Sequence, residues 1–90
     1  MMLVLPSELT HVQAQACLQM LAQGLRGQEG ATVLVDAGAL QHFDSAALAV
    51  LLAFRRECLV AGKHLAIRGL SSRLADLANL YGVTELLPAV

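Results

Sequence analysis

Apolar positions form two kinds of pattern that alternate along the chain. Residues 2–5, 31–35 and 65–67 are short runs of apolar or β-branched side chains. Runs of this length, bounded by glycine, proline or aspartate, are typical of strands that a fold covers on both faces. Pro6 ends the first run because proline has no N–H to donate to a neighbouring strand. We expect residues 31–35 to form the central strand of a sheet.

Between these runs, apolar residues recur at intervals of three and four, which predicts helices. The first helix spans about residues 11–25 and follows Thr10 and Gln13, whose spacing matches an N-terminal capping box. The second runs from Ser45 to about Ala61, before a glycine that suits a helix C-terminus.

A third helix begins at Ser71 or Ser72, residues that are favoured at helix N-termini. Gly82 closes it. Its apolar face is formed by Leu74, Leu77, Ala78 and Tyr81.

The resulting order is β-α-β-α-β-α, with residues 83–87 as a further short edge strand. Strands that alternate with helices indicate right-handed crossover units. We therefore predict the α/β class, with a mixed sheet of about four strands, three to four helices, and the second and third helices on one face. Ninety residues are the length of one domain, so residues 1–90 are expected to form a single domain.

Composition narrows the possible functions. Apolar residues make up 57% of the chain, above the roughly 45–50% that is usual in soluble domains. This excess suggests that part of the apolar surface is reserved for a partner. The net charge is −1 and the six basic residues are scattered, which argues against nucleic acid because phosphate binding needs a concentrated basic surface.

The expected location is the cytoplasm. Cys17 and Cys58 fall within predicted helices and form no metal-binding or redox motif, which indicates buried reduced thiols. The longest apolar stretch, residues 46–54, is far shorter than the roughly 20 residues that cross a bilayer. No secretory signal is evident at the start of the sequence. Direct membrane insertion is therefore not expected.

The most informative segment surrounds Asp44 and Ser45, at the start of the second helix. Free backbone N–H groups and the helix dipole favour an anion or an oxygen acceptor there, such as a phosphate on Ser45. Aspartate and serine are also the ordinary capping residues of helices, so a structural role explains the pair equally well. Residues 46–54 are apolar on every side of the helix, whereas packing on a sheet needs one apolar stripe. We therefore expect the first turns of this helix to form a docking surface, with Arg55 and Arg56 at its border.

Catalysis, metal binding and nucleotide binding receive little support. Ser45, His42 and Asp36 are the residue types of a hydrolytic triad, but the sequence has no nucleophile-elbow motif. The three histidines lack the spacing of metal ligands, and no phosphate-binding glycine motif is present. No cofactor and no enzymatic activity are expected.

A family resemblance supports the docking interpretation. The strand ending in Val35-Asp36, the segment from Phe43 to Leu52 and the segment from Ala61 to Leu70 occur in the order found in the STAS domain of anti-sigma factor antagonists. The chain resembles this domain from about Leu5 to the C-terminus. Its last third, from Leu74 to Pro88, is most similar to the cytoplasmic STAS subunits of ABC transporters that move phospholipids and maintain outer-membrane lipid asymmetry.

The resemblance implies two alternative partners. One is the ATPase subunit of such a transporter, in which case the protein is peripheral to an inner-membrane complex. The other is an anti-sigma factor kinase, with phosphorylation of Ser45 as the switch. In either case the implied partner-binding residues are His42, Phe43, Asp44, Ser45, Ala46, Ala49 and Arg55.

Overall fold

The computed structural model describes residues 2–90 and confirms the α/β class with three helices. The elements, in chain order, are β1 (Leu3–Val4), β2 (Glu8–Leu9), α1 (Ala14–Leu25), β3 (Thr32–Asp36), β4 (His42–Phe43), α2 (Ala46–Val60), β5 (His64–Arg68), α3 (Ser72–Leu80) and the 3₁₀ turn η1 (Thr84–Leu86). The three predicted helices and the first three predicted strands therefore exist, with boundaries that differ by a few residues.

The main sheet has the strand order β1-β3-β5, so β3 is central as predicted. Leu3 pairs with Val35, and Val35 pairs with Ile67 on its other side. Every strand pairing within residues 2–90 is parallel, whereas we had expected a mixed sheet. The reason is that β1 and β3 are each followed by a helix that returns the chain to the same end of the sheet.

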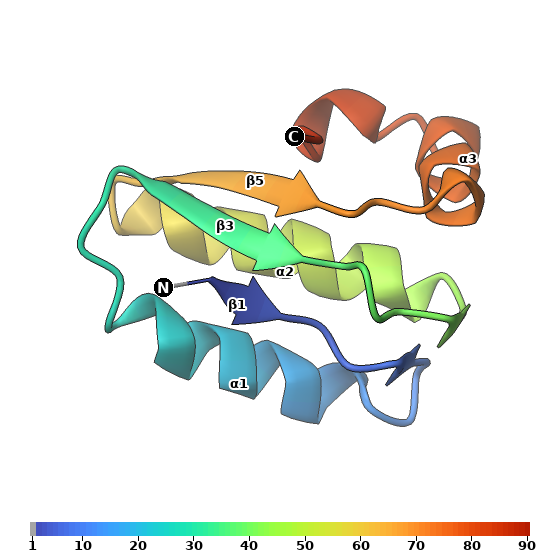
Figure 1. Ribbon diagram of the computed structural model, residues 1–90, viewed down its shortest axis with the longest axis horizontal. Coiled ribbons are helices and arrows are strands. Elements are labelled where there is room, and N and C mark those ends of the chain that lie inside the picture. Colours follow the sequence, from blue (N-terminus) through green and yellow to red (C-terminus); the bar gives the residue numbers. More distant parts are fainter. Residues whose placement is uncertain (1) are drawn as a thin grey trace.

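A second, two-stranded sheet pairs β2 with β4, beyond the carboxyl ends of β1 and β3 (Figure 1). Glu8 lies opposite His42 and Leu9 lies opposite Phe43. The Ser7 carbonyl adds to this connection by accepting hydrogen bonds from the backbone N–H groups of Gln41 and His42. Glu8–Leu9 and His42–Phe43 each hold one polar and one apolar residue and lie in no apolar run, which is why these two strands were not predicted. The small sheet holds together the two segments that lead into α1 and α2.

The core lies between the main sheet and the helices. Figure 1 shows α2 behind β3 and β5, and α1 packs alongside α2. Phe54 of α2 and Leu21 of α1 are completely buried, together with Val33 of the central strand. Leu74 of α3 belongs to the same core, so α2 and α3 both contribute side chains to it. The free thiols of Cys17 and Cys58 are buried as expected.

The tail differs from the prediction of an edge strand over residues 83–87. Gly82 has a φ of 70°, a value that favours glycine, and turns the chain at the end of α3. The following N–H groups then bond locally, as when Leu86 donates to the Val83 carbonyl, and so form η1. Strand-like pairing occurs only further on, where Ala89 pairs with Ile67 beside β5.

Candidate functional site

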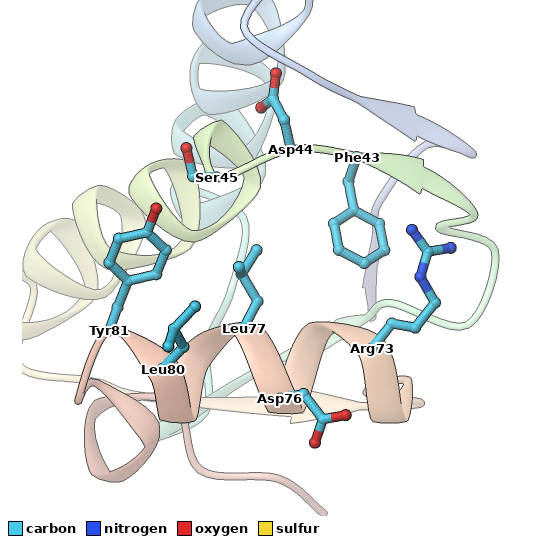
Figure 2. A pocket seen from close by; sticks show the side chains of 8 residues that line it. All are labelled: Phe43, Asp44, Ser45, Arg73, Asp76, Leu77, Leu80 and Tyr81. Carbon is cyan, nitrogen blue, oxygen red and sulfur yellow. The ribbon is translucent and has the colours of Figure 1, made fainter.

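Asp44 and Ser45 have different roles at the start of α2. Asp44 Oδ1 accepts a hydrogen bond of 2.8 Å from the Ala46 backbone N–H. Ser45 occupies the N-cap position but makes no capping hydrogen bond with its side chain. The capping role proposed for the pair therefore belongs to Asp44, and the exposed Ser45 hydroxyl projects from the first turn of the helix (Figure 2).

Asp44 also binds the segment that precedes α1. Its Oδ2 atom accepts a hydrogen bond of 3.2 Å from the His11 backbone N–H and lies 3.3 Å from His11 Nδ1. The pKa of Asp44 is lowered from its ordinary value of 3.8, chiefly by the hydrogen bond from the Ala46 N–H and further by His11, against an opposing effect of desolvation. Asp44 is therefore ionised at neutral pH and is committed to these partners.

The first turns of α2 reach the surface along one side only. Leu48, Val50 and Leu51 are buried in the protein's own core, because α1 and the sheet cover them. Ser45 and Ala49 are exposed on the opposite side. The chain's own core therefore covers the other sides of these turns. What remains for a partner is a single stripe along α2.

A groove of about 580 Å³ lies between the start of α2 and the length of α3 (Figure 2). Its lining combines apolar side chains with charged and hydroxyl groups. The lining residues are Phe43, Asp44, Ser45, Arg73, Asp76, Leu77, Leu80 and Tyr81. β4 supplies Phe43 and α3 supplies most of the opposite wall.

Arg73 packs over the aromatic ring of Phe43 at one end of this groove. Its guanidinium carbon lies 5.0 Å from the ring centroid, which is within the range of a cation–π interaction. Its Nη1 atom also donates a long hydrogen bond of 3.4 Å to the Gln41 carbonyl. Arg73 therefore connects α3 to the segment that enters α2.

A second groove, of about 340 Å³, continues from the first along α2. Its lining residues are Ser45, Leu48, Ala49, Leu52, Tyr81 and Val83. Ser45 and Tyr81 line both grooves and therefore stand where the two meet. Ala49 in turn borders a shallow apolar hollow between α1 and α2. We call the two grooves together the α2–α3 surface.

The structure brings together only part of the residue set that the sequence suggested. Phe43, Asp44, Ser45 and Ala49 line the α2–α3 surface. The others are not in its lining: His42 is exposed on β4, and Ala46 and Arg55 are half-buried on α2.

Sequence reasoning missed the contribution of α3. Tyr81 was assigned to the core face of the third helix, yet its side chain is 58% exposed and only Leu74 and Ala78 of α3 are buried. Leu80 carried a usable signal in the sequence, because an apolar residue that lies off the apolar stripe of a helix faces solvent. In the structure its side chain is 79% exposed.

The described part of the chain contains neither a metal-binding cluster nor a membrane-spanning helix. No group of three or more histidine, cysteine, aspartate or glutamate side chains in residues 2–90 is arranged to hold a metal ion. Within the same residues, no helix has both the length and the apolar character needed to cross a membrane.

The α2–α3 surface has the features of a protein-interaction module. It is exposed and largely apolar, with a tyrosine and an arginine in its lining, and these two residue types are enriched where proteins bind one another. Comparison with known proteins agrees with this class. Residues 1–88 match the family model described as Mlab, STAS domain, and the chain belongs to this family. STAS domains are in general regulatory, non-catalytic protein-interaction modules.

The fold is also similar to that of a solved protein. The structure of an anti-sigma-factor antagonist (STAS) domain protein from Planctomyces limnophilus superposes with a TM-score of 0.78 at 14% sequence identity. The match covers 96% of this chain and 77% of the other. No curated protein is similar enough to this chain to count as a match.

Proposed function

We propose that this protein is a non-catalytic regulatory subunit of a phospholipid-transporting ABC complex that maintains outer-membrane lipid asymmetry. In this role it docks on the ATPase subunit, an MlaF-like protein, and holds it in an assembled, active form. The protein is then cytoplasmic and peripheral to an inner-membrane complex. Membership of the Mlab family supports this choice of partner.

The observation that carries the proposal is the exposed position of Ser45 at the junction of the two grooves. Ser45 has no capping bond to maintain, and the stripe of α2 beyond it consists of Ala49 and the half-buried Leu52. A small hydroxyl side chain beside short apolar ones lets another protein approach the helix closely. Tyr81 supplies a large side chain with little conformational entropy to lose on binding.

Co-expression with the ATPase subunit tests the proposal. The wild-type protein should co-purify with the ATPase and raise its rate of ATP hydrolysis. Ser45→Arg should weaken binding by about 2 kcal/mol or more, because a long charged side chain would fill the centre of the interface. The free energy of unfolding should change by no more than about 0.5 kcal/mol, since Ser45 is exposed and makes no capping bond.

Val60→Arg is the matched control, because Val60 is 88% exposed and ends the same helix. It lies fourteen positions after Ala46, the first residue of the helix, at a distance of about 20 Å. This variant should bind as the wild type does. A wild-type protein that fails to co-purify with the ATPase subunit would contradict the proposal.

A second candidate is an anti-sigma factor antagonist that is switched by phosphorylation of Ser45. The free, exposed hydroxyl of Ser45 favours it, and the similar solved structure is that of an anti-sigma-factor antagonist domain. A phosphate would add close to two negative charges at a helix N-terminus, where the dipole stabilises them. A partner that contacts this apolar stripe would then be repelled or displaced.

Incubation with an anti-sigma factor kinase and ATP distinguishes the second candidate from the first. Intact mass should rise by one phosphoryl group in the wild type and stay unchanged in Ser45→Ala. Ser45→Asp should then lose the partner that Ser45→Ala retains. Equal binding by the two variants would remove support for the switch.

A further inference from the structure

The first groove of the α2–α3 surface contains a cation without an anionic partner. Among residues 2–90 the one contact between a basic and an acidic side chain within 4.0 Å joins His11 to Asp44. Arg73 therefore has no carboxylate beside it, and its hydrogen bond to the Gln41 carbonyl is long. A guanidinium has five N–H donors, so most of those of Arg73 stay available to a ligand.

Neither of the two acidic residues in the same lining lies within ion-pair distance of Arg73. Both oxygens of Asp44 already accept hydrogen bonds, from Ala46 and from His11. Asp76 lies one turn from Arg73 on α3, and Figure 2 shows its carboxylate directed away from Phe43 and Leu77. On the inner side of the groove, the Arg73 guanidinium is therefore the charged group whose hydrogen-bonding atoms stay free for a ligand.

The surroundings of Arg73 make its guanidinium better prepared to bind an anion than that of an ordinary surface arginine. Phe43 lies beneath the guanidinium, and Leu77, one turn further along α3, adds an apolar side chain to the same groove. Packing against the ring restricts the long side chain, so less conformational entropy remains to be lost when a ligand binds. A partner that covers the groove would exclude water and strengthen a charge–charge contact there.

We infer that the partner segment seated in this groove places an apolar side chain against Phe43 and Leu77 and an aspartate or glutamate carboxylate against Arg73. The inference rests on the proposed function and specifies the chemistry of the docking segment on the ATPase subunit. Charge complementarity carries it, because an apolar segment without a carboxylate would bury Arg73 unpaired, at a high cost. The planar guanidinium can meet a carboxylate with two parallel hydrogen bonds.

Binding of the ATPase subunit to substituted forms of the full chain tests the inference. Arg73→Gln should weaken binding about tenfold and Arg73→Glu about a hundredfold, because the second change adds repulsion. Arg73→Lys keeps the charge and should stay closer to the wild type than Arg73→Gln does. Added salt should weaken wild-type binding more than binding of Arg73→Gln.

The melting temperature of each Arg73 variant should be measured as well. A change in it distinguishes a loss of packing against Phe43 from a loss of charge. Arg26→Gln is the control, since Arg26 is exposed at the far end of α1 and lines neither groove. One substitution of an acidic residue by arginine in the ATPase subunit should restore binding of Arg73→Glu and weaken binding of the wild type.

The inference is overturned if Arg73→Gln and Arg73→Glu bind the ATPase subunit as tightly as the wild type; the docking function then stands without it. Failure of the wild type to bind at all would instead remove the proposed function, and this inference with it. Two measurements on the chain alone check other occupants. Arg73-dependent binding to phosphatidylglycerol vesicles, or an Arg73-dependent dimer by light scattering, would assign the groove to a lipid headgroup or to a second copy and overturn the inference.

Discussion

The carboxylate of Asp44 joins the beginnings of two helices. It accepts a hydrogen bond from the Ala46 N–H in the first turn of α2 and another from the His11 N–H in the turn before α1. One side chain therefore fixes the start of the helix that carries Ser45 relative to its neighbour. Because Asp44 takes the capping role, Ser45 is left free to contact other molecules.

We predict that Asp44 makes the fold sensitive to acid. Hydrogen bonds from Ala46 and His11 lower its pKa in the folded protein below 3.8. Its stabilising contribution is therefore complete above pH 3.8 and is lost as the pH falls through the lowered pKa. Urea unfolding at a series of acidic pH values should show this loss in the wild type, and a smaller loss in Asp44→Asn. Parallel curves for the two proteins would contradict the prediction.

Removal of the N-cap of α3 should destabilise the fold. Ser71 Oγ accepts a hydrogen bond of 3.2 Å from the Leu74 N–H. Ser71→Ala should lower the free energy of unfolding by about 1 kcal/mol, because that N–H loses its partner. Urea denaturation would measure the change. Ser72→Ala is the matched control, since Ser72 is exposed and makes no such bond, and its effect should be much smaller.

Tyr81→Ala should affect binding much more than folding. The Tyr81 side chain is largely exposed and lines both grooves, so its removal leaves no cavity in the core. Affinity for the ATPase subunit should fall by about 2 kcal/mol, the scale of a tyrosine hot spot. Calorimetric titration and thermal melting of the same sample would measure both quantities. Val60→Ala also shortens an exposed apolar side chain, outside both grooves, and should change neither.

The two cysteines should resist modification until the protein unfolds. Burial raises the pKa of both the Cys17 and the Cys58 thiols above 9.0, which keeps them protonated and poorly nucleophilic. Labelling by a disulfide reagent at neutral pH should be slow in the native protein and rapid in urea. Rapid labelling of either thiol under native conditions would show that its helix opens locally.

Much of the fold could be predicted because long segments carry their own pattern. The strand around Val33 and Val35 and the helix that ends before Gly62 are both specified by local sequence. The β2–β4 sheet could not be predicted, since its pairing joins Glu8 to His42 across more than thirty residues and involves only two residues on each side. Tertiary contacts alone determine such pairings.

Only the part of the candidate site that lies on β4 and α2 was predicted from the sequence. Ser45 and Ala49 were found because they begin a helix with more apolar residues than packing on a sheet requires. Arg73 and Tyr81 belong to the surface because α3 packs beside the start of α2, and that arrangement is not encoded in any local pattern. The C-terminal edge strand was predicted at residues 83–87, several residues before the observed pairing at Ala89, for a similar reason. Local turns after Gly82 use the N–H groups that a strand would need.

The residues that follow η1 protect the outer edge of the sheet. The Ile67 N–H donates to the Pro88 carbonyl, and the Val90 N–H donates to the Ile67 carbonyl. The outward-facing backbone groups at the middle of β5 are thereby occupied. Without this tail, β5 would offer unpaired groups to any extended chain that it met. Residues 88–90 thus close this edge to strand addition by another chain.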